Sequence, residues 1–297
     1  MSLDNELELI FRAIESGKCL PFLGAGASSA YTDKNGNACD GLPSGYGLAK
    51  ELAQKCGYIN GVSYDLMKVA EYFVYKDSGD REQLQSAVAD AILIGCRPRP
   101  IHTALAQLLP VKVMLTSNYD TLLEDELKYY KRVLKLHYYD PTNPRTGHFN
   151  SSSYYNAKDR DVIVHKMHGS IEHPESIVIT QSDYIRYLAN LTDMDIGMPE
   201  FFRKTIIPQN TLLFIGYSLE DWNFQVIWEG ALANYEKSGV KKRSYAIVKN
   251  PKDFTISYWA ERHVKLLDLD ITEFAVKLAE RFNLEIPQLD IKKKATT

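Results

Sequence analysis

The apolar positions of this chain fall into two patterns that alternate along the sequence. In residues 4–16, apolar side chains recur at the i, i+3, i+4, i+7 spacing of an amphipathic helix: Leu7, Ile10, Phe11 and Ile14. Short apolar runs rich in β-branched residues predict buried strands at 18–23, 111–116, 162–167, 211–217, 244–248 and 264–267. Further helical stretches are predicted at 121–130, 222–236, 255–263 and 272–282.

This alternation of strands and helices predicts the fold class. Strands that are apolar along their whole length are buried on both faces, as in a parallel sheet covered by helices. We therefore expect a doubly wound, Rossmann-like α/β fold in a single domain over residues 1–297. Residues from about 48 to 109 predict three or four consecutive helices, and we interpret them as a helical insertion. Residues 138–161 are rich in turn formers and predict a long loop.

Composition narrows the classes of function. The 297 residues carry a net charge of -3, which argues against a basic surface that binds nucleic acid directly. The acidic N-terminus lacks the pattern of a signal peptide, and no run of about 18 apolar residues could span a membrane, so we expect a cytoplasmic protein without membrane contact. The four cysteines have no C-x-x-C spacing and indicate no zinc site: Cys19, Cys39, Cys56 and Cys96.

Small and polar residues gather where four predicted strands end. They are GAGAS at 24–28, TSNYD at 116–120, HG at 168–169 and GYSLED at 216–221. Open α/β sheets bind their ligands at the carboxyl ends of the strands, so these segments predict one site. In the first of them, FLGAGASSA at 22–30, a strand turns into a helix through two glycines, which is typical of a phosphate cradle. A tight structural turn would need the same residues.

Each polar residue in these segments also has a structural interpretation. His168 could be a hydrogen-bonded structural residue with no part in a reaction, and Asn118 could be a turn residue that caps the helix beginning near residue 121. Asp120 and Asp221 could cap helices.

Two other functions fit the sequence poorly. A metal site shared by His165 and His168 is disfavoured, because residues three apart on a strand face opposite sides of the sheet. Hydride transfer is disfavoured because Ser29 stands where the dinucleotide fingerprint has its third glycine, and no acidic residue ends a second strand about 20 residues later.

The motifs taken together resemble the sirtuin family, in the branch of NAD-hydrolysing domains found in bacterial anti-phage defence systems. The sirtuin pattern G-A-G-x-S, G-[IL]-P, T-Q-N-x-D, H-G and G-[ST]-S has counterparts in the same order at 24–28, 41–43, 116–120, 168–169 and 216–218. The resemblance extends from about residue 18 to residue 270. It implies a sirtuin-type sheet with NAD as the substrate and no metal.

The resemblance also implies a role for individual residues. His168 would be the general base, and Asn118 and Asp120 would line the pocket of the nicotinamide ribose. Ala25, Gly26 and Ser28 would cradle the pyrophosphate, while Gly216 and Ser218 would contact the adenosine side. The complete set implied for binding NAD is Gly24, Ala25, Gly26, Ser28, Pro43, Thr116, Gly216, Ser218 and Asp221.

Departures from the sirtuin pattern indicate the reaction. Sirtuin deacylases carry a four-cysteine zinc module and a Phe-Gly-Glu strand that grips the acyl-lysine peptide, and this sequence has neither. Water is then the expected acceptor, which predicts an NAD hydrolase that releases nicotinamide and ADP-ribose. A module that senses NAD or ADP-ribose without turnover is the alternative, and a protein deacylase fits less well.

The family resemblance implies a biological setting as well. Similar proteins deplete NAD in infected cells, as in abortive infection. We therefore expect a homo-oligomer that is controlled by a regulatory protein, such as a HerA-type ATPase or an Argonaute-like partner.

Overall fold

The computed structural model contains one parallel sheet of seven strands in the order β5-β6-β4-β1-β7-β8-β9. It describes residues 2–59, 64–76, 80–92, 96–140, 151–192, 198–219, 224–225, 228 and 244–289. The strands are β1 (Cys19–Leu23), β4 (Val113–Thr116), β5 (Val133–Tyr138), β6 (Asp161–Lys166), β7 (Thr211–Ile215), β8 (Ser244–Val248) and β9 (Val264–Asp268). All neighbouring strands pair in parallel, which confirms the doubly wound α/β prediction.

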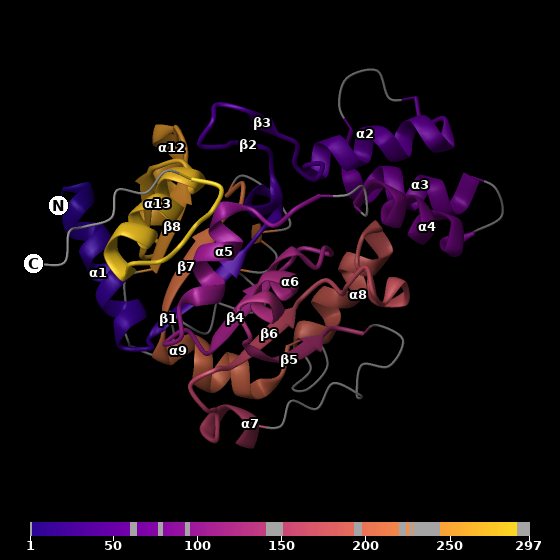
Figure 1. Ribbon diagram of the computed structural model, residues 1–297. Coiled ribbons are helices and arrows are strands. Elements are labelled where there is room, and N and C mark those ends of the chain that lie inside the picture. The colour runs from indigo at the N-terminus through magenta and orange to yellow at the C-terminus, as the bar shows by residue number, and fades with distance from the viewer. Residues whose placement is uncertain are drawn as a thin grey trace, which may run out of the picture.

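Helices cover both faces of this sheet (Figure 1). The helices of the protein include α1 (Leu3–Glu15), α2 (Gly45–Cys56), α3 (Leu66–Lys76), α4 (Arg81–Ile92), α5 (Pro100–Gln107), α6 (Leu122–Tyr129), α7 (Ser152–Tyr155), α8 (Gln181–Thr192), α9 (Ile207–Gln209), α12 (Asp253–Ala260) and α13 (Ile271–Phe282), of which α2, α3 and α4 do not lie on a face of the sheet. Short turns of other types are η1 (Ala25–Ser28), η2 (Pro174–Ser176) and the π-helical η3 (Phe202–Ile206). A small hairpin joins β2 (Tyr31–Thr32) to β3 (Ala38–Cys39).

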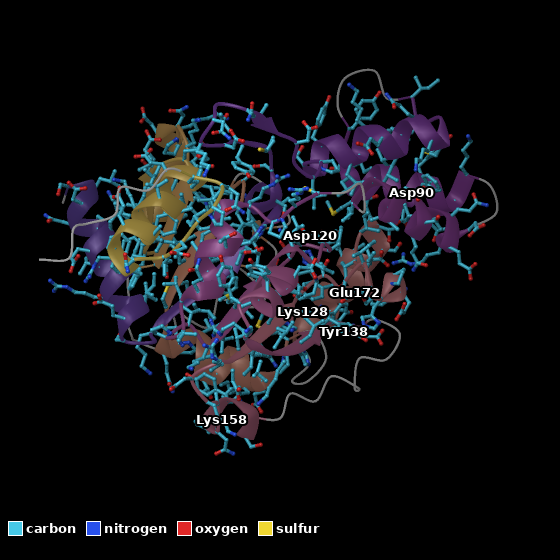
Figure 2. All side chains as sticks on the ribbon, viewed as in Figure 1. Asp90, Asp120, Lys128, Tyr138, Lys158 and Glu172 are labelled. Atoms are coloured by element: carbon cyan, nitrogen blue, oxygen red, sulfur yellow. The ribbon has the colours of Figure 1, made fainter. Side chains whose placement is uncertain are left out.

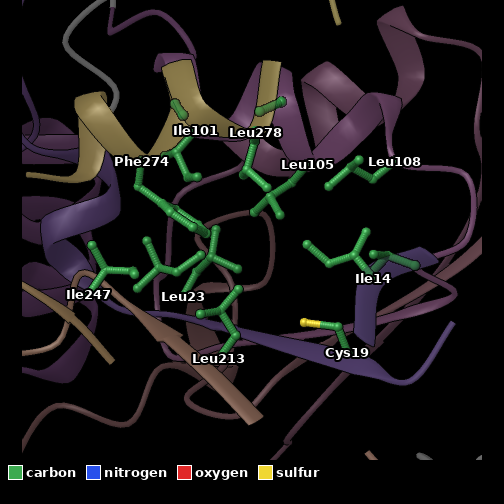
Figure 3. Close-up of a cluster of buried hydrophobic side chains, with 14 of the residues drawn as sticks. Ile14, Cys19, Leu23, Ile101, Leu105, Leu108, Leu213, Ile247, Phe274 and Leu278 are labelled. Carbon is green, nitrogen blue, oxygen red and sulfur yellow. The ribbon is translucent and has the colours of Figure 1, made fainter. Parts of the chain in front are cut away.

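Side chains that alternate along the strands build a hydrophobic core on each face of the sheet. On one face, Leu23 and Leu213 belong to a cluster that α1, α5, α6 and α13 complete. Figure 3 shows Ile101, Phe274 and Leu278 gathered over these two strand residues. The opposite face packs against α8, η3 and α12. Burial on both faces explains why the strands read as nearly continuous apolar runs.

The helices of the predicted insertion divide into two groups. Helices α2, α3 and α4 share a separate hydrophobic cluster, in which Leu52, Val69 and Val88 are buried with Ile177 and Ile179 from the segment before α8. Helix α5 lies within the predicted interval but packs on the sheet, against α6 and α13. The α2–α4 unit therefore stands at one end of the sheet, as Figure 1 shows.

Residue types that favour helix capping stand at the ends of α2 and at the start of α13. Ser44 caps α2 by accepting a hydrogen bond from the Gly47 N–H at 3.1 Å, and Gly57 ends it in the left-handed conformation. Asp270 caps α13 in the same way through the Thr272 N–H at 2.8 Å. These caps fix where α2 and α13 begin, and both helix starts border the cavity described below.

Two sequence predictions need correction or fall outside the structure. The sequence did not predict strand β5, which includes Lys135 and His137, is only partly buried and, among the described residues, pairs only with β6. Strand β5 also occupies the first residue of the predicted loop at 138–161, which contains α7 as well. Residues 141–150 of that loop, and nearly all of the helix predicted at 222–236, lie outside the described residues.

Candidate functional site

A cavity of about 500 Å³ opens at the carboxyl end of the sheet. The chain leaves β1 toward β4 on one side of the sheet and later fills the other side with β7, so the strand order reverses beside β1. Dinucleotides bind at such a switch point in doubly wound folds. The predicted site residues that line the cavity are His168, Asn118, Asp120, Ala25, Gly26, Ser28, Pro43, Gly216 and Ser218.

Two predicted residues lie behind this lining, and one is not described. Gly24 accepts a hydrogen bond at its carbonyl oxygen from Asn118 Nδ2 at 3.1 Å. Thr116 Oγ1 accepts from the Asn118 N–H at 3.0 Å and donates to the Leu23 carbonyl at 3.0 Å. Gly24 and Thr116 therefore hold Asn118 in place. Asp221 lies outside the described residues.

The glycine corner brings the chain after β1 against the chain after β7. The Gly26 N–H donates to the Gly216 carbonyl at 2.8 Å, and a Cβ on Gly26 would approach Gly216 Cα to 2.9 Å. The corner continues into the single 3₁₀ turn η1, not into an α-helix. The N–H groups of Gly24, Gly26 and Ala27 already donate to carbonyls, so they are not the free amides that the phosphate-cradle interpretation assumed.

A hydrogen-bonded network joins the corner to the segment after β4. Ser28 Oγ donates to Asp120 Oδ2 at 2.9 Å, and Asn118 Nδ2 lies 3.4 Å from the same Ser28 oxygen. Asp120 Oδ1 also accepts from the Leu122 N–H, at the first residue of α6, at 3.0 Å, so this carboxylate is tied to the start of α6 while it lines the cavity. Figure 2 labels Asp120 where the sheet meets the α2–α4 unit.

His168 lies at the floor of the cavity with 2% of its surface exposed. Its ring makes T-shaped contacts with the rings of Tyr184 and Tyr187, each at a centroid distance of 5.2 Å, and its Nε2 has no hydrogen-bond partner in the described structure. Burial lowers the pKa of His168 to about 3, so the ring is neutral at neutral pH. The neutral ring has a lone pair that can accept a proton, but with a pKa of about 3 it is a much weaker base than an ordinary histidine.

The fold holds His168 through its neighbours. The Val178 N–H donates to the His168 carbonyl at 3.1 Å. Gly169 follows with φ +82°, where a Cβ would lie 2.2 Å from the Ser176 carbonyl oxygen. The H-G pair is therefore required by the backbone as well as by any chemistry, since only glycine fits that position without strain.

Both ends of the cavity are lined by residues that the sequence motifs did not predict. Leu48 and Leu66 from the α2–α4 unit line one part, and Tyr184 from α8 stands beside His168. Lys249 and Asp270 line the part beyond β8 and β9, where they form an ion pair at 3.1 Å. These residues come from segments without a short motif, and they meet only through the tertiary fold.

The expectation that His165 and His168 face opposite sides of the sheet is wrong: β6 ends at Lys166, and both rings pack against the core cluster on the face that meets α8 and η3. Their ring contacts nevertheless differ. His165 Nδ1 is 2.7 Å from His137 Nδ1, and its ring stacks on Phe202 on the face that packs against η3. His173 stacks on Tyr138 at 4.4 Å. Across the described ranges, no three histidine, cysteine or acidic side chains converge as a metal site would need.

The fold and the site together define a doubly wound α/β protein with a dinucleotide-sized cavity at its switch point. The family model of the SIR2-like domain matches residues 112–267, just over half of the chain, and the protein belongs to this family.

Several relatives are named NAD(+) hydrolase ThsA. The protein of Bacillus cereus (strain MSX-D12) is 26% identical over 82% of this chain and 46% of its own length. That of Cytobacillus dafuensis is 30% identical over 76% of this chain and 41% of its own. Defense-associated sirtuin 2 of Bacillus subtilis is 24% identical over 90% of this chain and 25% of its own length. The chain thus spans about half the length, or less, of these curated relatives.

Proposed function

We propose that this chain is an NAD hydrolase domain that cleaves the bond between nicotinamide and ribose, producing nicotinamide and ADP-ribose. The observation that carries the proposal is the convergence of Asn118, Asp120 and His168 on one cavity at the switch point of the sheet. Relatives named NAD(+) hydrolase support the same activity.

The switch point suggests how NAD lies in the cavity. A dinucleotide crosses this crevice with one nucleotide on each side. We assign the nicotinamide half to the side of β4 and β6, where Asn118 and His168 lie, and the adenosine half to the side of β7, β8 and β9. The pyrophosphate then passes the glycine corner, where the absence of side chains on Gly26 and Gly216 leaves room for close approach.

The residues supply what cleavage of this bond requires. As the bond from ribose C1′ to the nicotinamide nitrogen breaks, positive charge develops on the ribose, and the Asp120 carboxylate stabilises it. Asn118 is fixed by Gly24 and Thr116 and orients the attacking water with its amide oxygen. The water oxygen bonds to C1′ and its proton passes to neutral His168, while nicotinamide leaves with the bond electrons.

The setting of this activity is also proposed. We propose a role in defence against phage by depletion of NAD; the name of the Bacillus subtilis relative, Defense-associated sirtuin 2, supports a role in defence. Within the described residues, no helix is both long enough and apolar enough to cross a membrane. We place the protein in the cytoplasm, where its substrate is abundant, and we propose that a homo-oligomer under the control of a protein partner carries the activity.

One observation favours a second candidate, a module that binds NAD or ADP-ribose without turnover. His168 Nε2 is buried and its ring packs against Tyr184 and Tyr187, so the ring must become accessible before it can take a proton from water. A sensing module would not need this rearrangement.

The test is to incubate the purified chain with NAD, with and without an acyl-lysine peptide, and to separate the products by chromatography. We expect equal amounts of nicotinamide and ADP-ribose, independent of the peptide. Release that depends on the peptide would indicate a deacylase. Calorimetric binding of NAD that remains whole would indicate the sensing module.

A further inference from the structure

A buried lysine lies directly beneath the candidate site. Lys166 is the last residue of β6 and is fully buried, as is its partner Glu124 on α6. Its Nζ donates to Glu124 Oε1 at 2.7 Å and to the backbone carbonyl oxygen of Asp120. Lysine is rarely buried unless it is paired, so this placement calls for a reason.

The position of Lys166 in the sheet explains its reach. Lys166 pairs with Thr116 in the parallel register of β6 and β4, so it stands beside the chain that leaves β4. Its side chain contacts the segment that carries Asn118 and Asp120, and Lys166 does not line the cavity itself. It can therefore act on the site only through that segment.

Asp120 is held from three directions. Lys166 binds its carbonyl oxygen, the Leu122 N–H binds Oδ1, and Ser28 Oγ binds Oδ2. Ser28 in turn lies 3.4 Å from the Nδ2 of Asn118. The contact with Lys166 is the one among these that reaches Asp120 from beneath the cavity, and it fixes the backbone while the side chain faces the ligand.

Stability alone does not explain the Lys166–Glu124 pair. Desolvation offsets much of the attraction in a buried ion pair, and apolar side chains of similar volume are often as stable. Burial raises the pKa of the Glu124 carboxyl, against the opposing effect of Lys166. An apolar pair, however, would leave the Asp120 carbonyl without the hydrogen bond from Lys166 Nζ. What the Lys166–Glu124 pair specifically provides is therefore the geometry of the segment that carries Asn118 and Asp120.

We propose that Lys166 is a positioning residue of the NAD-cleaving site: it holds the Asp120 carbonyl from beneath, with Glu124 fixing its ammonium group, and so sets the place of Asp120 and Asn118. What these two residues then do to NAD rests on the proposed function. The placement of Asp120 and Asn118 by Lys166 does not depend on the proposed function.

Two double variants separate this role from general stability. Lys166→Met with Glu124→Leu removes the charges and the donor together, which avoids leaving one charge unpaired. Lys166→Gln with Glu124→Gln removes the charges but keeps an amide donor for the Asp120 carbonyl. Lys135→Met is the matched control, because Lys135 pairs with Asp161 at 3.5 Å in the same sheet and does not line the cavity.

The readouts are turnover of NAD and hydrogen exchange of the segment 117–122. For the Met/Leu variant we expect nicotinamide release to fall by about tenfold or more with KM changed less than about threefold, and the amides of 117–122 to exchange about tenfold faster. The Gln/Gln variant should recover most of both properties, and Lys135→Met should change neither.

The proposal is overturned if the Met/Leu variant folds and keeps wild-type turnover and exchange, or if Gln/Gln and Met/Leu lose turnover alike. If neither double variant folds, Glu124→Gln decides: it should speed exchange of 117–122, and unchanged exchange would contradict the role. If the wild-type chain itself leaves NAD whole, the proposed function fails, and the positioning role is judged by exchange alone.

Discussion

The backbone of Gly216 lies directly against that of Gly26, with the Gly26 N–H donating to the Gly216 carbonyl at 2.8 Å. Gly216 has φ +79°, and a Cβ added to it would come within 2.2 Å of the Ala27 nitrogen. The chain after β1 and the chain after β7 can approach this closely only because neither Gly26 nor Gly216 has a side chain. The corner between β1 and β7 therefore leaves no room for a side chain at Gly216.

Replacing Gly216 by alanine should damage both fold and site. The left-handed φ costs about 1–2 kcal/mol, and the clash with the Ala27 nitrogen adds a cost of similar size. We expect the free energy of unfolding to fall by about 3 kcal/mol in a denaturant titration. Gly36→Ala is the control, because Gly36 has φ +80° but open space around its Cβ, and it should lose only about 1–2 kcal/mol. Equal losses of unfolding free energy in the two variants would contradict the clash between a Cβ at position 216 and the Ala27 nitrogen.

Asn118→Asp should stop turnover while leaving the fold intact. The change keeps the size of the side chain but removes the Nδ2 donor to the Gly24 carbonyl. We expect nicotinamide release to fall by about a hundredfold, a typical effect of losing an orienting group. Asn210→Asp is the matched control, since Asn210 is also buried and donates to a backbone carbonyl, that of Ile206, at the start of β7. If both variants kept wild-type turnover, Asn118 would have no part in the reaction.

Arg132 should support stability without affecting the reaction. Its guanidinium donates to the carbonyls of five residues at the amino ends of the strands: Ala106, Leu108, Val111, Arg160 and Asp161. Arg132→Met would leave these carbonyls without their donor and should cost about 3 kcal/mol of unfolding free energy. Turnover per folded molecule should not change, because the cavity lies at the opposite end of the sheet. A large fall in turnover with unchanged stability would contradict a purely structural role for Arg132.

The strands were predictable from the sequence because the sheet is buried on both faces. Each predicted run corresponds to a strand within a few residues. Strand β5 escaped prediction because it is an edge strand whose residues, such as Lys135, are only partly buried. Edge strands carry no continuous apolar signal, so their pairing with β6 appears only in the tertiary fold.

The site was predictable only where a strand end carries a short motif. Asn118, Asp120 and His168 meet because parallel strands end at one edge of the sheet. The Tyr184 ring beside His168 comes from a helix with no motif, so its place depends on long-range packing. Lys166 did give a signal: a lone charge inside an apolar run is costly to bury and therefore points to a specific partner.

Stability should fall as the pH is lowered from about 6.5, the ordinary pKa of histidine, toward about 4 and about 3, the pKa values of buried His102 and His168. Burial lowers the pKa of His168 to about 3 and that of His102 to about 4, and lowers the pKa of His165 as well. In the unfolded chain these groups take up protons below their ordinary pKa of about 6.5, whereas the folded protein does not. The unfolded state thus binds more protons, and each such group lowers stability by up to about 1.4 kcal/mol per pH unit in that window.

His168→Gln provides the check on this pH dependence. Denaturant titrations at several pH values should show a slope smaller by about one proton in the variant than in the wild type. An identical slope would mean that His168 is not the buried neutral group described here.

The most direct test of the account is the release of nicotinamide and ADP-ribose from NAD by the wild-type chain and by His168→Ala, measured by chromatography with folding checked by circular dichroism. We expect the wild type to form both products in equal amounts and the folded variant to form almost none. If the folded variant released nicotinamide as fast as the wild type, the base and the cavity assigned here would be wrong.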